Sequence, residues 1–402
     1  MKFGDQFRRE DFFDNSKLVE SDNEKNHMAN WSNLSCDAIE HIMGFLSLPD
    51  RHRFSAVCQN WRRVAKYNSC SPVEQLPWLM MREDASIKKR KFYSLTEKRH
   101  YYIDIPELQN TRWIGSSFGW LFIVDRKFIP QLFNPFTREC FELPMFPRFE
   151  EEMRHEGLVK AILSHDPSKT HDFTVLLLYY INNITRMAFW RPGENTWRCV
   201  PCNDYVSDAI FFRGNFYLAC TEHLFVLSNV EANLIMKQVM PIFIACVKYL
   251  VDFMGELLLV GRHLKIVGDP FAMNIRDDKR LHIVTARFVV HKLNLEGRKH
   301  SECKDLDDGT IFLGIGCPLV VNSQLFPGCK RNSIYFTDLV LKLFPEPYGC
   351  DDLGVYDFTR DIIEPYYPPG IFHPIAEPPI WLTPNASKSA YGHSSNKNIN
   401  KR

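Results

Sequence analysis

The sequence predicts a small all-α segment of three short helices followed by an all-β propeller of six or seven blades. Apolar residues recur at helical spacing between residues 31 and 67. From about residue 91 onward they form short runs separated by polar turns, and one strand–turn–strand unit recurs. The chain contains 31 Phe and 24 Pro, a composition that favours strands joined by turns.

The helical segment begins near residue 30 and ends near residue 70. Ser35 is a candidate N-cap, and Asp37 follows in the first turn, where the helix dipole favours a negative charge. Three helices in about 35 residues are too short to bury a self-sufficient core. We therefore expect this segment to lean on another domain or on a partner.

This segment resembles the F-box. The resemblance lies in Leu34, in the turn Phe45-Leu46-Ser47-Leu48-Pro49-Asp50 and in the closing run Val57-Cys58-Gln59-Asn60-Trp61-Arg62. Ser35 stands where the family usually has Pro, and both residue types start helices well. An F-box implies docking on a Skp-family adaptor, and through it on a cullin.

The apolar side chains of the F-box are the candidate adaptor contacts. We expect Trp61 to be the anchor, because large aromatic residues dominate such interfaces. Basic side chains are expected at the rim, where charges chiefly tune association rate, and these are Arg51, Arg53, Arg62 and Arg63. The candidate contacts are Leu34, Ile39, Ile42, Phe45, Leu46, Leu48, Pro49, Val57, Cys58 and Trp61.

The strand-rich region repeats a hairpin of two short strands, often followed by Pro. Repeats of this length with about four strands each are typical of propeller blades, and a long pair of irregular β-sandwiches is the alternative. The hairpins are expected at residues 92–106, 132–144, 188–201, 224–236 and 355–365, and one more starts at Phe288 with its turn at Glu296-Gly297.

The same region resembles the kelch-related propeller of a large plant F-box family, long catalogued only as a domain of unknown function. The matching residues include Gly119-Trp120-Leu121, Phe133-Asn134-Pro135-Phe136-Thr137 and Glu142-Leu143-Pro144. A later match runs from Gly328 to Asp338, and the resemblance spans roughly residues 75 to 370.

These patterns predict a domain organisation. Polar composition predicts disorder at the N-terminus and in the tail from about residue 384, and Met28 is a possible alternative start. The predicted parts are an N-terminal segment (1–29), the F-box (30–70), a linker (71–90), the propeller (91–372) and a C-terminal tail (373–402).

Composition limits the partners. A net charge of +1 supplies no overall field for nucleic acid or an anionic membrane. The apolar runs are only as long as strands, and the charged N-terminus lacks the apolar core of a signal peptide. We expect a protein of the cytoplasm, the nucleus or both, with its 12 Cys as reduced thiols.

Motifs that could carry chemistry are weak. Cys199-Val200-Pro201-Cys202 lacks the second ligand pair of a zinc site and the following helix of a redox motif. Gly314-Ile315-Gly316 lacks the third glycine of a nucleotide-binding motif. We therefore predict no catalytic residues, no cofactor and no metal.

The sequence thus predicts a non-catalytic subunit of a Skp–cullin–F-box (SCF) ubiquitin ligase whose propeller binds an unknown protein substrate. Two alternatives remain. The first is an F-box protein with a non-degradative regulatory or scaffolding role. The second is a propeller enzyme with acid and base residues at the central channel.

Overall fold

The computed structural model describes residues 31–46, 54, 57–67, 76–84, 88–127, 129–146, 158–181, 184–202, 204–230, 233–243, 245, 247–267, 282–326, 328–337, 352–366 and 379–383. The chain divides into two compact units, residues 1–70 and 71–402. Each unit is described by itself. No helix among the described residues is long and apolar enough to cross a membrane.

The first unit, called the helical unit below, contains η1 (Trp31–Asn33), α1 (Cys36–Phe45) and α3 (Gln59–Tyr67). Phe54 is also helical, and its neighbours on both sides lie outside the described residues. Ser35 caps α1 as predicted, because its hydroxyl accepts a hydrogen bond from the Ala38 N–H at 3.3 Å. Asp37 lies in the first turn of α1, also as predicted.

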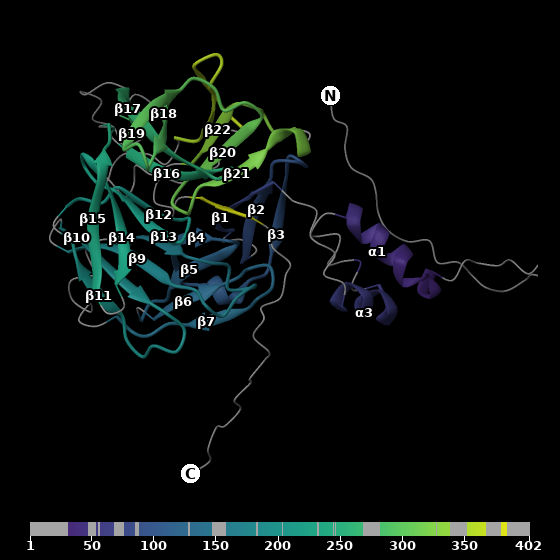
Figure 1. Cartoon of the computed structure of the whole chain (residues 1–402). Coiled ribbons are helices and arrows are strands. Elements are labelled where there is room, and N and C mark those ends of the chain that lie inside the picture. The colour runs from purple at the N-terminus through teal and green to yellow at the C-terminus, as the bar shows by residue number, and fades with distance from the viewer. Residues whose placement is uncertain are drawn as a thin grey trace, which may run out of the picture. The chain divides into compact units, whose positions relative to one another are not determined.

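The second unit is a six-bladed β-propeller, which confirms the predicted fold class (Figure 1). Each blade is one sheet of hydrogen-bonded neighbouring strands. Blade 1 contains β25 (Ile380–Leu382), β1 (Trp78–Asp84), β2 (Lys89–Ser94) and β3 (Arg99–Ile103), in that order across the sheet. Blade 2 contains β4 (Arg112–Ser117), β5 (Trp120–Val124), β6 (Pro130–Phe133) and β7 (Cys140–Glu142). Blade 3 contains β8 (Leu158–Leu163), β9 (Val175–Ile181), β10 (Ile184–Trp190) and β11 (Arg198–Pro201).

The remaining blades follow in chain order. Blade 4 contains β12 (Asp208–Phe212), β13 (Asn215–Ala219), β14 (His223–Val230) and β15 (Asn233–Pro241). Blade 5 contains β16 (Val247–Phe253), β17 (Glu256–Val267), β18 (His282–Asn294) and β19 (Lys299–Cys303). Blade 6 has five strands, which across the sheet are β21 (Leu319–Asn322), β20 (Gly309–Leu313), β22 (Ser333–Phe336), β23 (Gly354–Asp357) and β24 (Ile362–Glu364). Short 3₁₀ turns lie at η2 (Pro106–Leu108) and η4 (Ser323–Leu325).

The strand named first for each blade above is the innermost one and faces the axis. The contacts between neighbouring blades show this, because β25 contacts β4, β4 contacts β8, β8 contacts β12, β12 contacts β16 and β16 contacts β21. The six hairpins predicted from sequence are the two outermost strands of the six blades, from β2–β3 in blade 1 to β23–β24 in blade 6.

The domain boundaries differ from the predicted ones at both ends of the propeller. Strand β1 lies in the predicted linker, and β25 lies in the predicted tail. The two strands pair antiparallel, with Leu79 opposite Trp381, so the last described strand completes the blade that the first strand begins. A strand of three residues whose partner lies about three hundred residues away leaves little local signal.

Blade 6 departs from the regular pattern. Its strands β20 and β22 run parallel, whereas all other paired strands in the described sheets are antiparallel. The segment that links β20 to β21 crosses the ring, because the Cys317 N–H donates to the Ser116 carbonyl in blade 2 at 2.8 Å. Gly316 permits this approach, since a Cβ there would lie 2.1 Å from the Ser116 hydroxyl oxygen.

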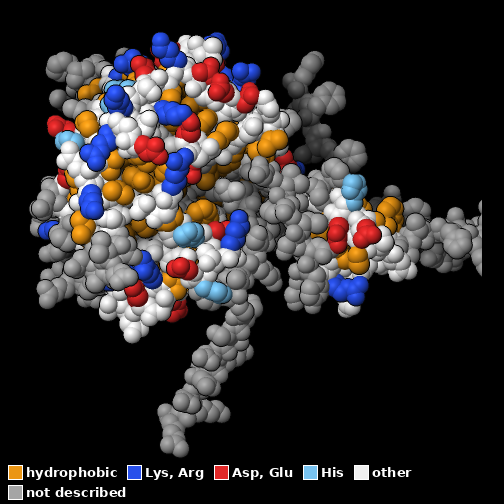
Figure 2. All heavy atoms as spheres, viewed as in Figure 1, with side chains coloured by type: hydrophobic (Ala, Val, Ile, Leu, Met, Phe, Trp, Pro, Cys, Tyr) orange, Lys and Arg blue, Asp and Glu red, His pale blue; other side chains and the backbone are white. Residues whose placement is uncertain are grey.

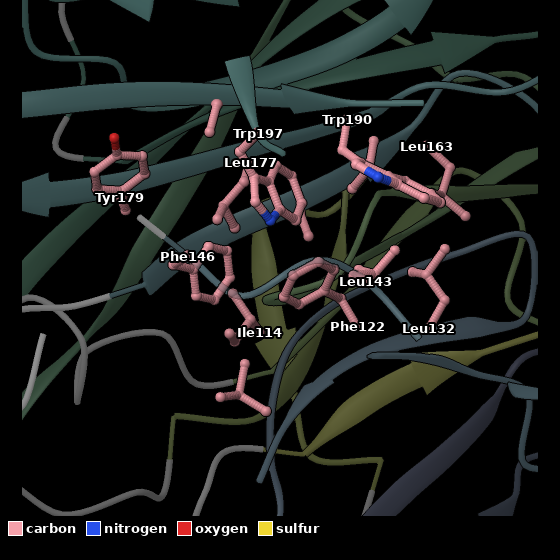
Figure 3. Close-up of a cluster of buried hydrophobic side chains, with 14 of the residues drawn as sticks. Ile114, Phe122, Leu132, Leu143, Phe146, Leu163, Leu177, Tyr179, Trp190 and Trp197 are labelled. Atoms are coloured by element: carbon pink, nitrogen blue, oxygen red, sulfur yellow. The ribbon is translucent and has the colours of Figure 1, made fainter. Parts of the chain in front are cut away.

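Large apolar side chains fill the spaces between blades. In the cluster between blades 2 and 3, the rings of Phe122 and Trp197 pack edge to face with centroids 6.4 Å apart, and Phe146 packs on Trp197 at 5.3 Å (Figure 3). The Trp197 indole N–H donates to the Pro144 carbonyl at 2.7 Å, so its polar atom is also satisfied. Such packing holds each blade against the next.

Candidate functional site

The helical unit has a small core made by four buried side chains. They are Ile39, Met43, Phe54 and Val64, and Leu34, Ile42, Leu46 and Trp61 pack against them while remaining partly exposed. The start of the unit is tied to α3 by side chains of α3 itself. The Asn60 amide donates to the carbonyls of Ser32 at 3.1 Å and Leu34 at 3.3 Å.

Trp61, the predicted anchor, makes contacts within the unit. Its ring stacks on Phe54 with centroids 4.0 Å apart, and its indole N–H donates to the Trp31 carbonyl at 2.9 Å. Its backbone N–H also lies 3.4 Å from the Cys58 sulfur. Replacing Trp61 by Ala would therefore disturb the unit as well as any surface that the indole presents.

The other predicted adaptor contacts divide by exposure. Ile39 is fully buried, whereas Val57 has 61% of its surface exposed. Leu34, Ile42, Leu46 and Cys58 are half-buried. Phe45 is the last residue of α1, and its side chain lies outside the described residues, as do Leu48 and Pro49. Of the predicted basic rim, Arg62 and Arg63 are exposed on α3, and Arg51 and Arg53 lie outside the described residues.

Sequence reasoning missed one exposed aromatic residue. Trp31 has 64% of its surface exposed and belongs to η1, directly before the N-cap of α1. Its carbonyl is fixed by Trp61, so the two tryptophans are joined in the fold. Trp31, Val57 and the half-buried apolar residues are available to a partner without unfolding the unit. Trp31 could have been identified from the sequence, because it is a large apolar residue directly before a predicted helix, in a segment too short to bury all of its apolar side chains.

The Cys-x-Pro-Cys motif places its two sulfurs in different surroundings. Cys199 is exposed on β11, and the Tyr179 hydroxyl lies 3.9 Å from its sulfur. Cys202 is buried in the cluster between blades 3 and 4, and its thiol donates to the Asp204 carbonyl at 3.3 Å. Burial raises the pKa of the Cys202 thiol, which disfavours the thiolate that metals and redox reactions require.

Two buried ion pairs were not predicted, and the first of them lies on the innermost strands. The Lys160 ammonium on β8 bonds to Asp208 on β12, and the other Asp208 oxygen accepts from the Leu250 N–H on β16 at 2.7 Å. Burial raises the pKa of Asp208, and Lys160 opposes that rise. One carboxylate thus joins the inner strands of three blades, which is a structural arrangement. A lysine inside the apolar run LVKAIL was the available sequence signal.

The second pair links blades 5 and 6 through Arg262, which has no exposed surface. Its guanidinium contacts Asp352 Oδ2 at 2.5 Å, donates to Thr285 Oγ1 at 2.7 Å and donates to the Thr337 carbonyl at 3.0 Å. Asp352 also accepts from the Thr285 N–H at 2.9 Å. All partners belong to the two blades, so this pair too serves the fold.

The surface is mixed in charge, and Figure 2 shows Lys and Arg interspersed with Asp and Glu on the face in view.

Comparison with known proteins agrees with both units. The family model of the KIB1-4 beta-propeller matches residues 92–357, and the F-box domain model matches residues 31–70. The F-box protein SKIP23 of Arabidopsis thaliana is 26% identical over an alignment of 408 positions, gaps included, which covers 89% of this chain and 97% of that protein. The Arabidopsis F-box/kelch-repeat protein At1g57790 is 26% identical over 328 residues, covering 77% of this chain and 83% of that protein.

Proposed function

Because the chain belongs to the KIB1-4 beta-propeller family and carries an F-box domain, we propose that it is the substrate-recognition subunit of an SCF ubiquitin ligase. The observation that carries the proposal is the division of the chain into a small helical unit with exposed apolar residues and a large closed propeller. An F-box docks a Skp-family adaptor, which leaves the propeller to hold another protein. The relatives are named as F-box proteins, in agreement with this assignment.

Adaptor docking would use the exposed side of the helical unit. Val57 and Trp31 supply the most accessible apolar surface, and Ile42, Leu46 and Trp61 supply partly buried surface beside the core. When a partner covers apolar residues that a small unit leaves exposed, their removal from water stabilises the complex. Ile39, which has no exposed surface, would act by holding α1 in place.

The propeller would bind the substrate, and ubiquitin transfer would be the work of partner subunits. The chain would then raise the transfer rate by holding the substrate near the ligase, which is a proximity effect. Turns at the ends of the blades can vary without disturbing the strands, which suits a binding platform.

The test uses the purified full-length chain, a Skp-family adaptor and the cullin-containing remainder of the ligase. We expect a stoichiometric complex with the adaptor. We also expect ubiquitin to be transferred to a protein that co-purifies with the propeller, and that protein to accumulate in cells when the proteasome is inhibited.

The control is Val57→Asp, which alters the docking side and leaves the propeller unchanged. It should retain the co-purifying protein, bind the adaptor more weakly than the wild type, and reduce ubiquitination of the co-purifying protein in proportion. Failure of the wild-type chain to bind any Skp-family adaptor would exclude the proposal. Adaptor binding without modification or turnover of the bound protein would favour the non-degradative role.

A further inference from the structure

Three turns place bulky side chains in the left-handed backbone region. They join the first two strands of blades 2, 4 and 5, and their φ angles are +53° and +82° at Phe118-Gly119, +45° and +82° at Arg213-Gly214, and +53° and +86° at Met254-Gly255. Two successive positive φ angles are characteristic of type I′ turns, whose first central residue is preferably Asn, Asp or Gly. Phe, Arg and Met are strained there.

Phe118 and Met254 are unusual in a second respect. Among the described residues, eleven other than glycine have a positive φ, and nine of them are charged or Asn. Phe118 and Met254 are the two apolar exceptions, and they are 44% and 59% exposed. Neither strain nor exposed apolar surface stabilises the folded propeller. Strained backbone positions cluster where proteins bind ligands, and exposed apolar patches often mark interaction surfaces.

Contacts between neighbouring blades join these turns into one surface. The Trp120 indole N–H, directly after the first turn, donates to Ser168 Oγ of blade 3 at 3.1 Å. In the same blade 3 loop, the His165 ring packs on Phe211 of blade 4 at 5.1 Å. The Arg213 guanidinium then donates to the Gly255 carbonyl of blade 5 at 2.7 Å.

The direction of the strands places these turns at one end of the propeller. The innermost strands β4, β8, β12 and β16 start from the same end, because each regular blade has four alternating strands and returns the chain to where it began. The segments that follow them therefore lie together at the opposite end, near the axis. We call the surface formed by Phe118, His165, Arg213 and Met254 the turn rim.

Charge defines what the turn rim can bind. Arg213 is exposed, and among the described residues no carboxylate lies within ion-pair distance of its guanidinium. Its bond to Gly255 and its position over the Phe212 ring, 5.0 Å from the centroid, fix its orientation. A guanidinium has five N–H donors, so donors remain for a carboxylate.

We propose that the turn rim binds an extended segment of a partner protein that presents apolar side chains to Phe118 and Met254 and an Asp or Glu carboxylate to Arg213. That the partner is a ubiquitination substrate rests on the proposed function above. The binding surface itself rests on the strained, exposed turns. The rim is preformed, because the turns are held by contacts between blades, and a preformed surface lowers the entropic cost of binding.

The first experiment selects ligands for this surface. A phage-displayed library of random 16-residue peptides is enriched on the full-length chain bound to its adaptor, and the enriched peptides are synthesised. We expect a consensus that combines apolar residues with Asp or Glu. A library that yields no binding peptide, or a consensus rich in Lys and Arg, would overturn the proposal.

The second experiment changes the rim without harming the fold. Phe118→Asn and Met254→Asn convert the turns to the favoured Asn-Gly form, so thermal stability should stay equal or rise. Each should weaken peptide binding at least about tenfold by fluorescence anisotropy, a change that corresponds to about 1.4 kcal/mol. Arg213→Asn should weaken binding similarly and remove the preference for Asp and Glu.

The matched control is Lys88→Asn. Lys88 is exposed and has a φ of +51°, but it lies between β1 and β2, at the other end of the blades. It should leave peptide binding unchanged. Rim variants that bind peptide as tightly as the wild type would refute the site, and so would binding losses that appear only together with a lower melting temperature. If the peptide binds the rim but nothing is ubiquitinated, the site stands and the ligase assignment fails.

Discussion

Among the described residues, the two units of this chain differ in whether they bury charged side chains. The helical unit buries four apolar side chains and leaves Trp31 and Val57 largely exposed. The propeller buries charged residues, with Arg262 paired to Asp352 and Lys160 paired to Asp208. A ring of six blades has enough apolar surface to support buried ion pairs, whereas a unit of two or three helices does not.

This difference indicates where each unit obtains its stability. The propeller is complete within one chain, since β25 pairs with β1 and closes the ring. The helical unit keeps apolar surface that its own residues do not cover. Changes at the closing strand or at a buried charge should therefore act on folding, and changes on the exposed side of the helical unit should act on binding.

The largest effect is expected from removing the closing strand. Deletion of residues 379–402 removes Ile380, Trp381 and Leu382, all buried, and leaves β1 without its inner partner. Each such loss costs about 2–5 kcal/mol, so the sum approaches the 5–15 kcal/mol by which domains are typically stable. Circular dichroism and thermal melting should show a largely unfolded propeller.

Deletion of residues 384–402 is the matched control, because it keeps β25. This shorter deletion should melt like the full chain. A deletion from residue 379 that still melts cooperatively at the wild-type temperature would mean that β25 does not close the ring.

The next largest effect is expected from Asp352→Ala. It leaves the fully buried Arg262 without its carboxylate, which typically costs about 3–5 kcal/mol in the free energy of unfolding. Urea denaturation measures the loss. The double variant Arg262→Met with Asp352→Leu should recover most of it, because no buried charge remains. A cost of less than about 1 kcal/mol for the single variant would show that Arg262 is compensated elsewhere.

A smaller effect, confined to binding, is expected from Val57→Asp. A carboxylate placed on the exposed apolar side of the helical unit should weaken adaptor binding by about 2 kcal/mol, the size of an interface hot spot. Calorimetric titration with the adaptor measures it, and the circular dichroism of the chain should not change.

Ile39→Ala is the contrasting variant, because Ile39 is buried in the core of the unit. It should lose adaptor binding only together with helical structure. If Val57→Asp binds the adaptor as tightly as the wild type, docking uses another face of the unit.

The smallest effect is expected from Asp357→Asn at the outer hairpin of blade 6. Burial alone would raise the pKa of Asp357, but the Lys330 ammonium at 2.9 Å and the N–H groups of Thr359 and Arg360 hold it below its usual range. We expect a loss of about 1–2 kcal/mol at pH 7, moderated by solvent because Lys330 is partly exposed.

The same group gives a pH dependence with a defined sign. A carboxyl whose pKa is lower in the folded state stabilises the protein above its unfolded pKa of about 3.9. That stability is lost as the pH falls through the lower, folded pKa. Urea midpoints of wild type and Asp357→Asn should therefore differ at pH 7 and converge below about pH 3. A difference that persists at low pH would assign the effect to packing.

Much of the fold could be predicted from local sequence. Ser35 is predictable as the N-cap of α1, and the six outer hairpins are predictable because each has two short apolar runs around a polar turn. The parallel pairing of β20 with β22 and the closing strand β25 are not, because both depend on partners distant in the sequence. For the same reason the sequence predicts six or seven blades and does not choose between them.

The site was predictable only as a set of candidates. The sequence pattern placed Ile39 and Val57 in one group of apolar F-box residues. The structure shows that Ile39 is buried in the core and that Val57 is exposed. The glycines at positions 314 and 316 invited a nucleotide-binding interpretation, but Gly316 allows a strand connection to pass beside Ser116. Neither distinction is visible without the packing.

The sequence by itself determined the order of the two units, the type of each repeated hairpin and the family, because these follow from local periodicity and short motifs. The tertiary structure decided which apolar residues remain exposed, how blade 1 is closed and which strained turns meet near the axis. These depend on contacts between residues far apart in the chain, such as Arg213 with Gly255 and Leu79 with Trp381. Burial and proximity are properties of the packed chain, and local sequence limits them without fixing them.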